Sequence, residues 1–147
     1  MLRHMLTNRS MPSSSVIPVL GYPDIGKAIE WLQDVFGFSL RWRAGNHRAQ
    51  LNIGDGAVAV TELQLEGIHR ATGQGYHSHS VMVRVDDVDA HHKRSRRHGA
   101  RILQPPADYP YGERQYTVED LAGHIWTFSQ SIADVAPEEW GGASFQL

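Results

Sequence analysis

The sequence predicts an α+β fold built from two βαβββ units. Three features support this: an amphipathic helical stripe follows a short apolar strand, three short strands follow the helix, and the whole order then returns once. The residues expected to cap the two helices, Asp24 and Asp87, lie 63 residues apart. A repeat of this length with only two copies indicates a duplicated supersecondary unit rather than a solenoid.

The first unit begins with the strand VIPVLGY at Val16. Asp24 is a favourable helix N-cap, and Gly37 stands where a glycine commonly ends a helix. Between them an apolar stripe recurs at helical spacing, made of Ile25, Ala28, Ile29, Leu32 and Phe36. Glycine-containing turns then separate three expected strands, which are Ser39–Arg43, Arg48–Ile53 and Ala57–Leu65.

The second unit repeats this order. A strand at His79–Val85 precedes a helix that Asp87 caps and that runs to Gly99. The segment from Pro105 to Gly112 is expected to be a loop. The remaining strands are expected at Ala100–Gln104, Glu113–Val118 and His124–Ser129, the last two forming a hairpin around Asp120.

These elements divide the chain into five segments. We expect a flexible leader with three methionines at 1–15, a first module at 16–66, a linker at 67–77, a second module at 78–130 and a tail at 131–147. The tail contains Trp140 and Phe145, and because free tails seldom keep large aromatic residues, we expect it to dock.

Alternation along the strands predicts which face meets the helices. Val81, Val83 and Val85 form one apolar row, and Trp126 and Phe128 form another. Trp31 lies beside the first helical stripe, so it is expected in the core with Trp126. The opposite, partly polar rows are typical of the wall of a small-molecule cleft.

Composition excludes several classes of protein. The chain is 41% hydrophobic and 20% charged, which indicates a globular protein, and no apolar run approaches the roughly 20 residues of a membrane helix. Its net charge of -2 gives no global reason to expect nucleic acid or a membrane as partner. The absence of cysteine excludes disulfides and is compatible with a cytoplasmic location.

Nine histidines invite a metal hypothesis, but their spacing is unfavourable. His91 and His92 are adjacent on a helix and point about 100° apart. We therefore expect both on solvated helix surface. The basic run Lys93–Arg97 follows the acidic start of the same helix, so it complements the helix dipole and does not indicate nucleic-acid binding.

Three segments carry a family resemblance: PVLGYPDIGKAIEWLQDVFGF, VMVRVDDVDAHHKRSRRHGARI and YGERQYTVEDLAGHIWTF. Over about residues 16–130 the chain resembles the vicinal oxygen chelate superfamily, which includes glyoxalase I, bleomycin-resistance proteins and extradiol dioxygenases. The resemblance implies two βαβββ modules that form an open, U-shaped barrel of mixed sheet with the helices outside. It also implies a homodimer and one ligand cleft per pair of modules.

The resemblance also implies where a metal centre would lie. Metal-dependent members draw one ligand from each of four strands, and the matching positions here hold Ile17, Glu62, Ser80 and Thr127. Only Glu62 is of the required residue type. We therefore expect no conventional metal centre and no cofactor, with a divalent metal on Glu62 as the alternative.

Several residues are candidates for contact with a ligand. Glu62 is the candidate catalytic base, although a solvated strand-end carboxylate would have the same sequence. Arg84 suits an anionic ligand or, equally, a neighbouring acid. In similar proteins the stretch from Asp108 to Tyr116 borders the cleft. The complete set of ligand-binding candidates is Trp42, Glu62, Ser80, Met82, Arg84, Tyr111, Arg114, Tyr116 and Thr127.

We therefore predict a homodimeric, cytoplasmic protein that binds a small, anionic or aromatic organic ligand in a cleft, without a conventional metal centre. One alternative is a metal-dependent lyase, isomerase or dioxygenase that uses Glu62. Another is a resistance protein that sequesters an antibiotic. Whether any reaction is catalysed is left open by the residues.

Overall fold

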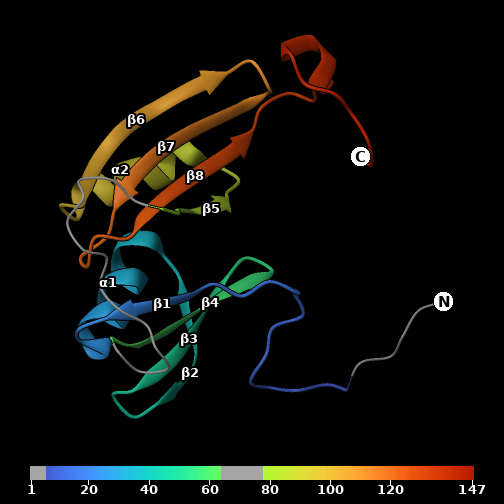
Figure 1. Ribbon diagram of the computed structural model, residues 1–147. Helices are drawn as coiled ribbons and strands as arrows, with labels where there is room; N and C mark the ends of the chain where they lie inside the picture. Colours follow the sequence, from blue (N-terminus) through green and yellow to red (C-terminus); the bar gives the residue numbers. More distant parts are fainter. Residues whose placement is uncertain (1–5, 64–77) are drawn as a thin grey trace. The chain divides into compact units, whose positions relative to one another are not determined.

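The computed structural model describes residues 6–63 and 78–147, and these form two compact units (Figure 1). In the described ranges, each unit contains one α-helix and one open, four-stranded mixed sheet. The predicted α+β class and the two βαβββ modules are therefore confirmed. The predicted linker 67–77 and the last residues of the first module lie outside the described residues.

The first unit holds β1 (Val19–Tyr22), α1 (Ile25–Phe36), β2 (Ser39–Ala44), β3 (Arg48–Ile53) and β4 (Gly56–Glu62). The strand order is β1-β4-β3-β2, with β1 parallel to β4 and the other pairs antiparallel. The predicted helix ends are confirmed. The Asp24 carboxylate accepts the Lys27 backbone N–H at 3.0 Å, and Gly37 adopts the left-handed conformation at φ 77°.

The second unit repeats this topology with β5 (Val81–Arg84), α2 (Val88–Arg97), β6 (Arg101–Tyr109), β7 (Glu113–Glu119) and β8 (Ile125–Ser131). Its strand order is β5-β8-β7-β6. Asp87 caps α2 through the Ala90 N–H at 3.0 Å, as predicted. Asp34–Phe36, the last turn of α1, groups with this unit.

The predicted loop from Pro105 to Gly112 is wrong, because β6 continues to Tyr109. The prolines suggested a loop since they donate no ladder hydrogen bond. In the structure they lie on an edge strand, between Gln104 and Ala107, where the pairing register with β7 shifts. Edge positions and bulges are the places where a sheet accepts proline.

The predicted core is confirmed except at Trp31, which is only half-buried and not part of the core. Trp126 and Phe128 are fully buried and Val83 nearly so, and they lie under α2 with Phe36, whose ring is 5.4 Å from that of Trp126. In the first unit the helical stripe is buried together with Leu51, Val58 and Val60.

The start of the C-terminal segment makes specific contacts within the second unit. The carbonyl of Gly112 accepts the N–H groups of Ile132 and Ala133, and the Trp140 ring lies 5.6 Å from that of Tyr111. Trp140 lies on a short 3-10 helix, η2 (Pro137–Trp140), whereas Phe145 is 91% exposed. Docking of the whole tail stays a prediction. Within the described part of the chain, no helix is long and apolar enough to span a bilayer.

Candidate functional site

The two faces of the second sheet differ sharply in character. Alternation places Tyr116, Val118, Trp126 and Phe128 on the face that α2 covers, and all four are fully buried. The opposite face, which we call the open face of the second sheet, is largely polar. Its residues are Met82 and Arg84 of β5, Glu113, Gln115 and Thr117 of β7, and Thr127 and Ser129 of β8.

Polar side chains on this open face are bonded to one another. One carboxylate oxygen of Glu113 accepts the Ser129 hydroxyl at 2.6 Å and the Gln115 amide at 3.0 Å. The hydroxyls of Thr117 and Thr127 lie 3.1 Å apart. These contacts hold the centre of the face in one arrangement.

Arg84 lies at the edge of the same face. Its Cα is the pairing partner of Ser129, its side chain is exposed, and it forms no ion pair with any described residue. An unpaired guanidinium is a fixed positive charge with five N–H donors, which suits a carboxylate or phosphate. The open face therefore carries an exposed cation, Arg84, on β5 and an oriented carboxylate, that of Glu113, on β7.

The structure separates the predicted site residues of this unit into two groups. Met82, Arg84 and Thr127 share the open face, and Ser80 precedes β5 in the same alternation. Arg114 and Tyr116 belong to the opposite row and contact α2. The sheet itself lies between the two groups, so one ligand on the open face would not touch both.

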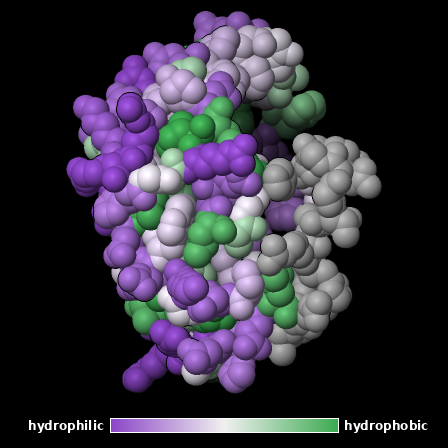
Figure 2. Space-filling model, turned by 90° about the vertical axis from the view of Figure 1, so that its left-hand side faces the viewer, coloured by the Kyte–Doolittle hydropathy of each residue, from purple (hydrophilic) through white to green (hydrophobic). Residues whose placement is uncertain are grey.

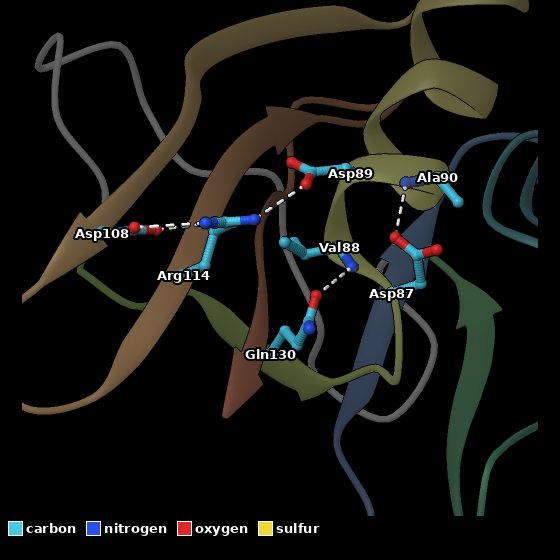
Figure 3. A network of polar contacts seen from close by, with 7 residues as sticks. All are labelled: Asp87, Val88, Asp89, Ala90, Asp108, Arg114 and Gln130. Atoms are coloured by element: carbon cyan, nitrogen blue, oxygen red, sulfur yellow. Dashed lines mark hydrogen bonds and ion pairs between the residues drawn. The ribbon is translucent and has the colours of Figure 1, made fainter. Parts of the chain in front are cut away.

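Arg114 is held by two carboxylates (Figure 3). Its guanidinium donates to both oxygens of Asp108, at 2.6 and 3.2 Å, and to Asp89 of α2 at 2.9 Å. These acids raise the pKa of Arg114, and the arginine lowers the pKa of Asp108. Asp108 and Asp89 join β6 and α2 to β7 through this one side chain, which gives Arg114 a structural role in the described contacts.

His91 contradicts the expectation of a solvated surface. Its Nε2 lies 3.0 Å from the Phe36 carbonyl oxygen, and its Nδ1 faces the Tyr116 hydroxyl, which also contacts Ser95 at 2.8 Å. Because a carbonyl only accepts, Nε2 carries the proton and Nδ1 accepts from Tyr116. Burial lowers the pKa of His91 to about 4 and raises the pKa of Tyr116 to about 12.

Tyr111 belongs to an aromatic cluster at the end of the second sheet. Its ring stacks on that of Tyr109 at 5.3 Å and meets Trp140 edge to face. Desolvation and the nearby Glu113 raise the pKa of the Tyr111 hydroxyl. The hydroxyl of Tyr109 accepts the Gln104 amide at 2.6 Å.

The two candidates of the first unit lie on different faces of its sheet. Glu62 has Tyr22 as its Cα partner and points to the opposite face from its neighbour Thr61. Its carboxylate lies 3.2 Å from His47 Nδ1. Trp42 is instead the Cα partner of Gln50, and its indole N–H donates to the Ser10 carbonyl at 3.1 Å.

The four positions implied for a metal do not fit a conventional centre. Ile17 offers no donor atom, the Thr127 hydroxyl is bonded to Thr117, and Glu62 faces His47. Among residues 6–63 and 78–147, no three His, Asp or Glu side chains converge on a common point. We therefore derive no chemical step through a metal.

The sequence reasoning missed Glu113, Gln115 and Ser129. The signal was present, because Val118 belongs with the helix-facing row and the odd positions of β7 therefore face the other way. Arg114 and Tyr116 have the same parity as Val118, so they cannot share a face with Met82 and Arg84.

The two units share one architecture, a βαβββ module with a helix on one face of a four-stranded mixed sheet. The model of the Glyoxalase/Bleomycin resistance protein/Dioxygenase superfamily matches residues 16–128, and the chain belongs to this superfamily. The comparison with curated proteins gave no significant match.

Solved structures agree with this assignment. TioX from Micromonospora sp. ML1 is 39% identical, covers 81% of this chain and 99% of its own, and superposes with a TM-score of 0.69. A glyoxalase-related enzyme from Fulvimarina pelagi is 19% identical, with 92% and 99% coverage and a TM-score of 0.66. Lactoylglutathione lyase from Agrobacterium tumefaciens is 17% identical, with 81% and 94% coverage and a TM-score of 0.63, so these last two show the fold alone.

Proposed function

We propose that the protein binds a small organic anion on the open face of the second sheet, without a conventional metal centre. The observation that carries this is Arg84, an exposed guanidinium with no acid paired to it in the described chain, beside a hydrogen-bonded polar face. Arg84 supplies the charge, Ser129 and Thr127 lie next to it across β8, and Met82 offers an apolar side chain that is 61% exposed.

Glu113 restricts which anions fit. Its carboxylate lies on β7, two strands away from Arg84 on β5. It repels any second negative charge of a ligand that lies over β7. The ligand is therefore expected to carry one anionic group at Arg84 and a neutral or hydrogen-bond-donating part over β8 and β7. Aromatic monocarboxylates, represented by benzoate, have this character.

Replacing Arg84 by alanine should weaken benzoate binding about tenfold or more, because a hydrogen bond to a charged group contributes about 1.5–3 kcal/mol. The measurement is a titration followed by the backbone amide resonances of β5 and β8. Arg97→Ala is the matched control, since this arginine is also exposed but lies on α2. It should change the benzoate affinity less than twofold.

Two results would contradict the anion site. One is an unchanged affinity in Arg84→Ala, and the other is a wild-type protein that shows no saturable binding of benzoate.

Glu62 defines the alternative of a metal-dependent lyase, isomerase or dioxygenase. Near one divalent ion per chain in protein purified without a histidine tag, lost in Glu62→Ala, would favour that enzyme. Protection of cells against cleft-sized antibiotics would favour a sequestering resistance protein.

We also propose that the protein is a homodimer. Both β1 and β5 are edge strands, and each leaves an apolar side chain in water: Val19 is 38% exposed and Met82 61%. Apolar side chains also reach the surface between polar ones on the face shown in Figure 2. Size-exclusion chromatography with light scattering should give twice the mass of the chain, and a monomer at micromolar concentration would contradict this.

The cysteine-free sequence is compatible with the cytoplasmic location that we propose.

A further inference from the structure

The face of the first sheet that Trp42 shares is built mostly from small side chains. Strand pairing places Gly21, Ala59, Gln50 and Thr61 on this face: Gln50 pairs with Ala59, and Thr61 pairs with Gly21. Val58 and Val60 point to the opposite face by alternation. We call Gly21, Ala57, Ala59, Gln50 and Thr61 the floor.

Two polar atoms of the floor are buried without a hydrogen-bond partner. Gln50 is 3% exposed and Thr61 is fully buried, yet Gln50 Oε1 and Thr61 Oγ1 have no partner among the described residues. Buried polar groups in native proteins are nearly always paired, because an unmet hydrogen bond is costly. Two such atoms on one face are hydrogen-bonding groups that residues 6–63 and 78–147 leave for a bound molecule to complete.

The two atoms are close enough to serve one small molecule. Gln50 and Thr61 are diagonal neighbours on adjacent strands, so their Cβ atoms lie about 7 Å apart. The amide oxygen of Gln50 accepts an N–H, and the Thr61 hydroxyl can donate or accept. Ala59 and Gly21 beside them are buried as well and carry almost no side chain, so no bulky neighbour on these strands screens the two polar atoms.

A segment near the N-terminus lies at the same face. The indole N–H of Trp42 donates to the Ser10 carbonyl, and the Arg41 guanidinium donates to the Met11 carbonyl at 2.8 Å and to that of Arg9 at 3.4 Å. We call residues 9–11 the strap. Its contacts are hydrogen bonds from side chains in exposed surroundings, which contribute little each and are easily opened.

We propose that the floor is a binding site for a flat, uncharged group with an N–H donor, such as an amide or lactam, and that the strap closes over it. The N–H of the ligand donates to Gln50 Oε1, and the Thr61 hydroxyl donates to the carbonyl oxygen of the same ligand group. The Trp42 ring borders the site. The group is uncharged because both unpaired atoms are uncharged. The floor belongs to the first sheet and Arg84 to the second, and the proposal does not depend on the anion site.

Benzamide and methyl benzoate test the proposal, because they have similar shapes and only the amide has N–H donors. In the wild type, benzamide should bind about tenfold more tightly than the ester and should shift the indole N–H resonance of Trp42. Arg41→Ala removes two hydrogen bonds to the strap in the full chain, and its benzamide association should be at least threefold faster.

Thr61→Val is the decisive variant, because valine has the shape of threonine without the hydroxyl. It should raise the Tm of the ligand-free protein by a few degrees, since a buried unpaired hydroxyl is removed, and it should cut the preference for benzamide over the ester at least threefold. Gln50→Met should reduce the same preference by a similar factor.

Equal affinity for benzamide and methyl benzoate in the wild type would overturn the proposal. So would a Thr61→Val protein that keeps the full preference, whatever its Tm. Arg48 borders the floor as the Cα partner of Thr61, so benzoate is included as a third ligand. Benzoate binding that is insensitive to Arg84→Ala but displaces benzamide would assign the floor to an anion and overturn the uncharged group.

Discussion

Asp120→Ala should lower the free energy of unfolding by about 4 kcal/mol, which is a large fraction of the stability of a small domain. One oxygen of this 6% exposed carboxylate accepts the backbone N–H groups of Ala122 and His124, each at 2.9 Å. The other accepts the indole N–H of Trp126 at 3.1 Å. Trp126 is fully buried, so the variant removes the carboxylate that accepts its indole N–H at a place that water does not reach.

Chemical denaturation of the variant at neutral pH measures this loss. Asp120→Asn keeps one oxygen that can accept the two backbone N–H groups of the turn, but it places an NH₂ group where the other oxygen accepts the indole N–H. It should therefore lower the free energy of unfolding by roughly half as much as Asp120→Ala. Asp134→Ala is the control, because this aspartate is exposed in the C-terminal segment, and it should change the stability by less than about 0.5 kcal/mol. A loss below about 1 kcal/mol in Asp120→Ala would show that the turn does not depend on the carboxylate.

The fold could be predicted from the sequence because its signals are local. Asp24 and Asp87 cap helices through residues three positions away, and Gly37 ends a helix through its own backbone angle. The strands could be predicted because apolar and polar side chains alternate along them. This pattern depends only on residues two positions apart. Such features do not require knowledge of which strand lies beside which.

β6 shows where local signals fail. Pro105 and Pro106 favour a loop by their own chemistry, and only the position of β6 at a sheet edge makes them acceptable in a strand. Edge position is a property of the whole sheet. It follows from the order β5-β8-β7-β6, which no neighbouring residue encodes.

The candidate site depended on pairings between distant residues, and these were the hardest to foresee. Alternation grouped Met82, Arg84 and Thr127 correctly, but the role of Arg114 followed from acids 6 and 25 residues away in the sequence. Glu113 was missed because its contact with Ser129 spans two strands. His91 was expected on the surface because it and His92 are adjacent on a helix and point apart, whereas its ring reaches Tyr116 and the carbonyl of Phe36.

Lowering the pH from 7 to 4 should cost the second unit about 3 kcal/mol of stability through His91 alone. In the folded protein burial lowers its pKa to about 4, and in the unfolded chain the pKa is near the model-peptide value of 6.5. Below about pH 6.5 the unfolded state takes up a proton that the folded state does not. The contribution is therefore fully present above pH 6.5, falls as the pH decreases and levels off below about pH 4.

The neutral ring is favoured by its partners as well as by burial. Nε2–H donates to the Phe36 carbonyl and Nδ1 accepts from Tyr116, so a second proton on Nδ1 would turn that acceptor into a donor. The Tyr116 hydroxyl would then have to point its own hydrogen elsewhere, and the nearby Arg94 adds like-charge repulsion. Protonation thus opposes both the hydrogen-bond pattern and the desolvated surroundings.

His91→Gln separates this effect from general acid denaturation. Glutamine keeps an N–H for the Phe36 carbonyl but does not titrate, so the variant should be less stable at pH 7 and should lose the slope between pH 6.5 and 4 that the wild type shows. His98→Gln removes an exposed histidine one residue beyond α2 and should keep the wild-type slope. Unfolding free energies from urea titrations at half-unit pH steps measure both. If His91→Gln retained the slope, the titrating group would lie elsewhere, and the buried network of His91, Ser95 and Tyr116 would not set the acid sensitivity of the fold.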